Sequence, residues 1–292
     1  MFPASQVSQK RNGFEFPFTQ TDFQTIVSIV YERSGIVLAA NKRDMAYARL
    51  VQRLRALELN SFHDYCALLN SRKGADEIGY LINAITTNLT KFFREAHHFE
   101  HLRKEALPEL IKSAKVATPR LKVWSAGCSS GEEPYSIAMT ALAARAEIGR
   151  DWDMNILATD LDTATLEVAK TGIYPKSSLE TLPAGLRERF FEVPARGPAG
   201  ANLQISRQVQ SLVTFNPLNL IKPWPPGMSF DVIFCRNVTI YFDVKTKESI
   251  VNRFHSILKD GGWLYVGHSE SLHSHQHQFK LCGRTIYRKI DG

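Results

Sequence analysis

Apolar residues recur at helical spacing from Thr19 to about Leu110, and strand patterns are almost absent from this part of the chain. The pattern predicts a helix over FQTIVSIVYERSG, with Thr21 or Asp22 as its N-cap and Gly35 as its end. Two further helices are predicted over SFHDYCALLNSR and DEIGYLINAITTNL. We therefore expect an all-helical N-terminal domain over residues 19–95, between a flexible tail at residues 1–18 and a linker helix and linker at residues 96–119.

The most regular helical pattern is NKRDMAYARLVQRLRALEL, which begins at Asn41. Asn41 can cap this helix, and Asp44 at the third helical position completes an arrangement like a capping box. On a helical wheel, Leu50, Val51, Leu54 and Leu57 form an apolar stripe, and Lys42, Arg49 and Arg53 form a cationic stripe beside it. The helix is expected to pack on one side, while the cationic stripe is of a kind that is most often a solvated face.

Strand and helix patterns alternate over residues 120–292. Strands are predicted over LKVWS, MNILATD, FDVIFC, WLYVG and RTIYRKI, with a DGG turn before WLYVG, and helices over EEPYSIAMTALAARAEIG, DTATLEVAKTG and VKTKESIVNRFHSIL. This alternation predicts an α/β fold with a doubly wound, mostly parallel sheet, and ligands at the carboxyl ends of its strands. RFFEVP and NLQISRQV, on either side of the loop ARGPAGA, interrupt the alternation and predict a small antiparallel insertion at about residues 173–211.

Composition and charge narrow the function classes. The 292 residues are 44% hydrophobic and 22% charged, as in an ordinary globular protein. There is no apolar run long enough for a bilayer span and no apolar region of a signal peptide, so we expect a cytoplasmic protein without direct membrane insertion. The four scattered cysteines are expected to be reduced thiols. A net charge of +7 favours an acidic partner, either nucleic acid, a membrane surface or a carboxylate-rich protein.

The loop after the first predicted strand is the first candidate binding element. It reads GCSSG, from Gly127 to Gly131, and is followed by Glu132 and Glu133 at the start of a helix. Two carboxylates would repel a pyrophosphate there, but they suit a ligand with a cationic end, such as S-adenosylmethionine. An equally good explanation is that both glutamates only stabilise the helix dipole.

Polar residues at later strand ends add to this candidate site. Asp160 ends the second strand, where an acid usually binds both ribose hydroxyls, and Asp162 is expected to cap the next helix. Asn219 and Leu220 follow the strand-like LVTF and could border an adenine. Arg236 and Asn237 follow FDVIFC, which places them at the predicted crevice of the sheet.

The order of these elements resembles a class I S-adenosylmethionine-dependent methyltransferase. Three blocks resemble the chemotaxis receptor methyltransferases of the CheR family more narrowly: TTNLTKFFREAHHF (86–99), SAGCSSGEEPYSIAM (125–139) and FDVIFCRNVTIYFD (230–243). The resemblance runs from about Phe23 to the last strand, and Thr239 departs from it because the family more often has a larger apolar residue there. It implies that the cofactor is bound by Asn88, Thr90, Arg94, Glu133, Asp160, Asn219, Leu220, Arg236 and Asn237, with Glu132 as an alternative to Glu133.

The resemblance also implies an activity: methyl transfer to glutamate γ-carboxylates of chemoreceptors, with S-adenosylhomocysteine as the product and no metal. Arg94 and Tyr241 would flank the reaction centre as catalytic residues. The expected partner is the cytoplasmic domain of a transmembrane chemoreceptor, recognised by Lys42, Arg49 and Arg53. NLQISRQV is a candidate acceptor of a receptor peptide. We expect a monomer that binds no nucleic acid.

Two other functions are weighed against this one. A nucleic-acid methyltransferase would agree with the basic charge, but the nearest match to its base-gripping motif, NPLN at 216–219, lacks the aromatic residue. A catalytically idle homologue that binds S-adenosylmethionine only to regulate a partner is the second alternative.

The histidine clusters His97, His98, His101 and His273, His275, His277 lack the further ligands that a metal site needs.

Overall fold

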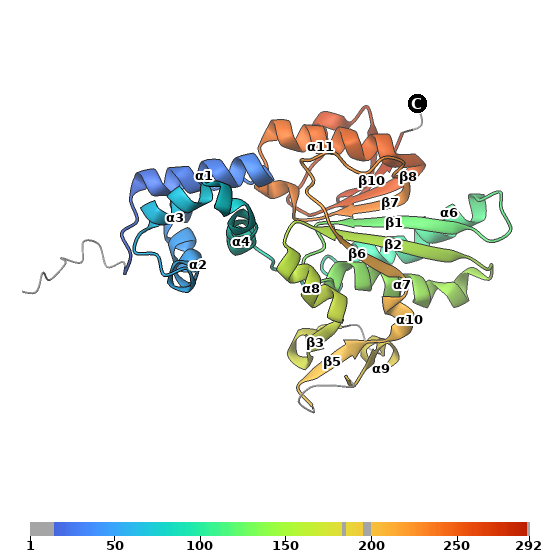
Figure 1. Cartoon of the computed structure of the whole chain (residues 1–292). Helices are drawn as coiled ribbons and strands as arrows, with labels where there is room; N and C mark the ends of the chain where they lie inside the picture. Colours follow the sequence, from blue (N-terminus) through green and yellow to red (C-terminus); the bar gives the residue numbers. More distant parts are fainter. Residues whose placement is uncertain (1–14, 183–184, 195–199, 291–292) are drawn as a thin grey trace, which may run out of the picture. The chain divides into compact units, whose positions relative to one another are not determined.

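The computed structural model describes residues 15–182, 185–194 and 200–290. The chain forms two compact units, residues 1–86 and residues 87–292, which are considered separately (Figure 1). Most of the predicted tail, and residues 195–199 of the ARGPAGA loop, lie outside the described residues. The helical unit thus ends before residue 95, because residues 87–95 belong to the second unit. Among the described residues, no helix is both long and apolar enough to cross a bilayer.

The first unit contains the four predicted helices, α1 (Gln20–Ser34), α2 (Arg43–Ala56), α3 (Phe62–Leu69) and α4 (Ala75–Ile85). Two predicted caps are wrong. Thr19 caps α1 and Asp22 is its capping-box partner at the third helical position. Asn41 lies inside a 3-10 turn, Ala40–Lys42, that precedes α2, so its side chain does not cap that helix.

Aromatic residues extend the core of the first unit beyond the predicted helical boundary. Leu50, Val51 and Leu54 of the predicted apolar stripe are buried. Phe18 is buried as well, and its ring lies 4.1 Å from that of Phe62, centroid to centroid. The end of the predicted tail is therefore part of this core. Burial of an aromatic ring of this size stabilises the unit by about 1.5–3 kcal/mol.

The second unit is built on a seven-stranded sheet in the order β6-β2-β1-β7-β8-β10-β9. Its strands are β1 (Arg120–Ala126), β2 (Asp153–Asp160), β6 (Val213–Pro217), β7 (Phe230–Cys235), β8 (Leu258–Val266), β9 (Phe279–Gly283) and β10 (Ile286–Lys289). The pairs from β6 to β8 are parallel, and β10 runs antiparallel to β8 and β9. The predicted doubly wound sheet is confirmed, and its strand order reverses between β1 and β7.

Helices α7 (Glu132–Ile148), α8 (Thr163–Thr171) and α11 (Val244–Ile257) connect the parallel strands, as predicted. Two details of the strands differ from prediction. The DGG segment is no separate turn, because β8 continues through it with an irregular register beside β7. The strand β9 was not predicted, since the alternation in its residues FKLCG extends over only Phe279, Lys280 and Leu281.

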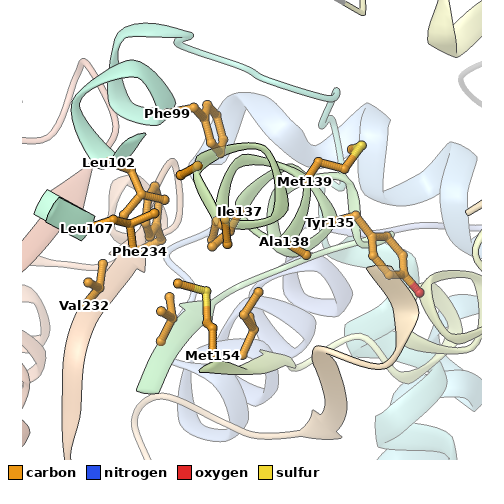
Figure 2. Packing of buried hydrophobic residues seen from close by; sticks show 14 of the residues in the cluster. Phe99, Leu102, Leu107, Tyr135, Ile137, Ala138, Met139, Met154, Val232 and Phe234 are labelled. Carbon is orange, nitrogen blue, oxygen red and sulfur yellow. The ribbon is translucent and has the colours of Figure 1, made fainter. Parts of the chain in front are cut away.

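The predicted linker helix is instead a core element of the second unit. It forms α5 (His97–His101), a π-helical segment (Leu102–Ala106) and α6 (Leu107–Ser113) without a break. Figure 2 shows Phe99, Leu102 and Leu107 in the same packed cluster as Ile137 of α7 and Phe234 of β7. The interpretation as a linker fails because most apolar side chains of this segment are buried in the core of the second unit.

The predicted insertion is confirmed as a three-stranded antiparallel sheet in the order β3-β5-β4. Its strands are β3 (Ile173–Pro175), β4 (Phe191–Glu192) and β5 (Asn202–Ile205), with the short helices α9 (Leu186–Phe190) and α10 (Arg207–Gln210) beside them. NLQISRQV therefore divides into a strand and a helix. Because β5 pairs with β3 on one side and β4 on the other, it has no open edge for a peptide.

Candidate active site at the switch point of the sheet

The loop after β1 begins the candidate site, where the strand order reverses. Gly127 has a φ of +88°, and a Cβ at this position would lie 2.3 Å from Cγ2 of Val238, in the loop after β7. A side chain is therefore excluded by both backbone conformation and space. The glycine allows the loops after β1 and β7 to approach each other, which brings the second and third sequence blocks together.

Arg236 lies at the centre of a buried charge network. Its guanidinium is 3.0 Å from a carboxylate oxygen of Glu133 and 3.3 Å from one of Glu95. It also donates to the carbonyl of Arg94, and Ser125 donates to Glu133 at 2.8 Å. One guanidinium thus faces two carboxylates, so the network has one negative charge in excess when all three groups are ionised.

The pKa values of the two carboxyls move in opposite directions. Burial raises the pKa of Glu133, although the Arg236 guanidinium and the Ser125 hydroxyl oppose the effect. Burial also acts on Glu95, but Arg236 and the backbone N–H of His268 outweigh it and bring the pKa of Glu95 below its ordinary value. Glu95 is therefore the more firmly ionised partner of the guanidinium.

Glu132 and Glu133, which the sequence could not distinguish as candidate cofactor ligands, have different partners in the structure. Glu133 joins Arg236 at the end of β7, whereas Glu132 accepts a hydrogen bond from Ser130 at 2.7 Å. Burial raises the pKa of Glu132, and no ion pair involving it was found among the described residues. Of the two, Glu133 is the one that contacts the residue directly after β7.

Asp160 is fixed at the end of β2 by backbone donors. Its carboxylate accepts from the N–H of Ser129 at 2.7 Å and from the N–H of Asp162 at 2.9 Å. Burial raises the pKa of Asp160, and these two donors oppose the rise. Ser129 has a φ of +49°, a conformation that residues other than glycine seldom adopt, so the loop after β1 is held in an unusual shape around this carboxylate.

Asp162 caps α8, as predicted, by accepting from the N–H groups of Ala164 and Thr165. The same side chain also accepts from Nδ2 of Asn88 at 2.7 Å, and the Asn88 carbonyl accepts from the Ser129 hydroxyl at 3.2 Å. The first sequence block is thereby joined to the loop after β1.

Thr90 and Arg94 lie half-buried in the same block, in which Phe93 and Glu95 also have positive φ values. Arg94 donates to the carbonyl of Leu89 at 2.9 Å, a contact that fixes its guanidinium to its own loop. The Tyr241 hydroxyl lies 3.5 Å from the Thr87 carbonyl, at the limit of a hydrogen bond.

Asn219 and Leu220 follow β6, the strand beside β2. The N–H of Leu218 donates to the carbonyl of Asp160 at 2.9 Å, which holds this segment next to the end of β2. The Asn219 side chain accepts from the N–H of Ile221, and Leu220 is buried. The order of the strands thus brings the predicted cofactor residues of β1, β2, β6 and β7 to one edge of the sheet.

The three predicted recognition residues lie in α2 and in the 3-10 turn before it, and they differ in their surroundings. Arg53 forms a two-pronged contact with the buried Glu77 of α4, with N–O distances down to 2.6 Å, and this hydrogen bond raises the pKa of Arg53. Arg49 donates to the carbonyls of Ile85 and Thr86, at the end of α4. Lys42 is exposed. Two members of the cationic stripe therefore connect α2 to α4 as well as bearing charge.

The histidines near the site have structural partners. His98 is buried against the Arg284 carbonyl and the Thr285 hydroxyl, and burial lowers its pKa to about 3. His101 lies 2.9 Å from the Tyr265 hydroxyl. Across the part of the chain that the structure describes, no three His, Cys, Asp or Glu side chains are grouped as a metal site would require.

Sequence reasoning missed two members of the site. Glu95 lies inside the first block, where its position directly after Arg94 was the only feature of the sequence that pointed to it. Glu270 accepts hydrogen bonds from the loop after β7 and comes from the loop after β8. Its sequence neighbourhood, GHSES, contains no periodicity or motif that predicts this contact.

Comparison with known proteins agrees with the two units. The family described as CheR methyltransferase, SAM binding domain, matches residues 88–288, and CheR methyltransferase, all-alpha domain, matches residues 21–86. The chain belongs to the CheR methyltransferase family. The resemblance inferred from the three sequence blocks is confirmed, and the S-adenosylmethionine-binding domain of the family coincides with the unit that contains the candidate site.

Relatives within the CheR family match nearly the whole chain. The Probable chemotaxis protein methyltransferase of Rhizobium etli is 44% identical over 89% of this chain and 96% of the relative. The Chemotaxis protein methyltransferase of Escherichia coli is 43% identical over 91% and 89%. Chemotaxis protein methyltransferase 2 of Pseudomonas aeruginosa is 38% identical over 98% and 99%.

Proposed function

We propose that this CheR-family chain transfers the methyl group of S-adenosylmethionine to glutamate γ-carboxylates of chemoreceptors. The observation that carries the proposal is the buried network of Glu133, Arg236 and Glu95 at the switch point, in a chain of this family. The two alternatives, a nucleic-acid methyltransferase and an idle cofactor-binding homologue, are not favoured by the relatives.

The residues at the strand ends fit this cofactor. The excess negative charge of the network complements an ammonium and a sulfonium group, and it would repel a pyrophosphate. Glu133 is the proposed partner of the cationic end, because Glu132 is turned to Ser130. Asp160 is the proposed acceptor for the ribose hydroxyls, since its carboxylate is already oriented by two backbone donors.

The remaining cofactor residues are proposed from their places around this edge. Asn88, Thr90 and Arg94 would contact the cofactor from the first block, and Arg236 and Asn237 from the end of β7. Asn219 and Leu220 would border the adenine, beside Asp160. No metal takes part in this proposal.

When bound, S-adenosylmethionine supplies an electrophilic methyl group, whose bond to sulfur breaks with the electron pair left on sulfur as the carboxylate oxygen–carbon bond forms. The glutamate of the receptor has an ordinary pKa of about 4.3 and is ionised at pH 7, so no general base is needed. The task of the protein is to orient the carboxylate. We assign this to Arg94 and to the Tyr241 hydroxyl, whose 3.5 Å contact with Thr87 leaves it able to turn to a substrate oxygen.

Receptor recognition is proposed to involve α2. Lys42 would attract the acidic receptor segments that carry the glutamates to be methylated. Arg49 and Arg53 would add positive charge from half-buried positions. A receptor peptide, if it adds to the insertion, would pair with the outer edge of β3 or β4, because β5 is the central strand. We further propose that the chain acts as a monomer in the cytoplasm and binds no nucleic acid.

Methyl-labelled S-adenosylmethionine and receptor-containing membranes test the proposal. Glutamyl methyl esters release volatile methanol in base, whereas methylated bases do not. Label that is released in base and depends on receptor is the expected result. Tyr241→Phe should reduce it, while Tyr31→Phe, a change at an exposed tyrosine of α1, serves as the matched control. Label in nucleic acid, or none in receptor, would refute the assignment.

A further inference from the structure

Glu270 is a buried carboxylate that the proposed methyl transfer does not use. Only 6% of the residue is exposed, and it lies in the loop that follows β8. Its oxygens accept five hydrogen bonds of 2.7–3.2 Å, from the N–H groups of Asn237, Val238, Ile240 and Gly267 and from the hydroxyl of Thr239. Four of these donors belong to the loop after β7, so one side chain fixes the path of that loop.

The loop held by Glu270 connects two residues of the candidate site. Arg236 precedes it and Tyr241 follows it. Within it, Asn237 has a φ of +58°, a backbone conformation that costs about 1 kcal/mol or more outside glycine. A charged acceptor on successive N–H groups stabilises such a turn. Glu270 is thus placed to set the direction of both the Asn237 side chain and the Tyr241 ring.

The Glu270 carboxylate is tightly packed on the side of Gly267. A Cβ at Gly267 would lie 2.6 Å from Nδ2 of Asn237 and 2.7 Å from Oε2 of Glu270. The loops after β7 and β8 therefore meet with no room for another atom. A small displacement of the carboxylate would be transmitted directly to Asn237.

Thr239 gives this chain a contact that depends on its own sequence. Its hydroxyl donates to Glu270 at 2.7 Å and is buried. An apolar side chain at this position would have no hydroxyl to donate. Thr239 thus adds one hydrogen bond to the four that the carboxylate accepts from backbone N–H groups.

We propose that Glu270 is a positioning residue that holds the loop of residues 237–240 in its cofactor-binding conformation, and that the Thr239 hydroxyl is part of this support. The inference rests on the proposed function, because it assumes that Asn237 contacts the cofactor. It concerns cofactor affinity, however, and does not depend on which substrate receives the methyl group.

The test compares the affinity for S-adenosylhomocysteine, measured by calorimetry at 25 °C, with the melting temperature followed by tryptophan fluorescence. Thr239→Val removes the hydroxyl at nearly constant volume, Thr239→Ser retains it, and Thr214→Val on the exposed face of β6 is the matched control. Loss of one hydrogen bond of ordinary net strength, which supports the loop and does not touch the cofactor, predicts an affinity lowered about 3- to 10-fold in Thr239→Val. Thr239→Ser and Thr214→Val should bind as the unaltered protein does.

Glu270→Gln should have the larger effect, a loss of about tenfold or more, because the amide replaces an acceptor with a donor facing N–H groups. Unchanged affinity in this variant would overturn the inference. So would equal weakening by Thr239→Ser and Thr239→Val, since the hydroxyl would then not be the cause. If Glu270→Gln does not fold, the Thr239 pair decides. If the Thr239 and Glu270 variants behave as expected but receptor is not methylated, the proposed function fails and the role of Glu270 stands.

Discussion

Replacing Arg236 by Met would remove the only guanidinium that faces both Glu133 and Glu95 within the described part of the chain. The Arg236 side chain is 2% exposed, and those of Glu133 and Glu95 are 11% and 13% exposed, so water screens the network little. Removing one partner of a buried ion pair costs about 3–5 kcal/mol, because the remaining charge is left uncompensated. In a unit of about 200 residues this lowers the melting temperature by about 6–20 °C.

The cost should depend on pH with a definite sign. In the unaltered protein the lowered pKa of Glu95 contributes stability above the unfolded value of about 4.3, and this contribution is lost as the pH falls through the folded value. Without Arg236, the pKa values of Glu95 and Glu133 both rise. As the pH falls, these carboxyls are therefore protonated in the variant before they are protonated in the unaltered protein, and the uncompensated negative charge disappears. The difference in stability between the two proteins is thus largest at neutral pH and becomes smaller below about pH 5.

Tryptophan fluorescence measures this change in the relevant unit, because Trp124, Trp152, Trp224 and Trp263 are all the tryptophans of the chain and all belong to the second unit. Arg103→Met is the control. Its pair with Glu147 is 3.2 Å long but exposed, so it should cost less than about 1 kcal/mol. A loss below about 1 kcal/mol for Arg236→Met, or a loss that is the same at pH 7 and about pH 4, would refute the reasoning.

Three further predictions concern the proposed roles. Asp160→Ala should weaken S-adenosylhomocysteine binding by about 1.5–3 kcal/mol in calorimetry, and unchanged affinity would exclude the ribose assignment. Tyr241→Phe should lower the single-turnover rate of methyl transfer with little change in cofactor affinity, and an unaltered rate would leave it a packing residue. Lys42→Glu should slow receptor methylation at low salt but not at high salt, whereas Lys112→Glu, an exposed change on α6, should not; equal rates at low salt would show that Lys42 does not attract receptor.

The sheet, and the grouping of the candidate residues at one of its edges, could be predicted from the sequence because both depend on local signals. Alternating strand and helix patterns determine the order of elements, and parallel strands then bring their carboxyl ends to one edge. Asp160 and Arg236 were found in this way, since each directly follows a strand pattern. The cap at Asp162 was equally local.

Features that depend on packing were not predictable in this way. A helical wheel gives the angular position of Arg53 on α2, but not that Glu77 of α4 lies opposite it. Apolar spacing in α5 and α6 was visible, yet only the structure shows that the sheet needs this helix as cover. Glu270 reaches the loop after β7 only because β8 lies next to β7, and neither its residue type nor its spacing indicates that contact.

The most direct measurement of the central claim is mass spectrometry of a chemoreceptor after incubation with this protein and S-adenosylmethionine. The account predicts the added mass of a methyl ester on glutamate side chains of the receptor, removed by base and absent when S-adenosylhomocysteine is present in excess. Methylation on another residue type or on nucleic acid, or an unmodified receptor in the presence of protein that binds S-adenosylhomocysteine, would contradict it.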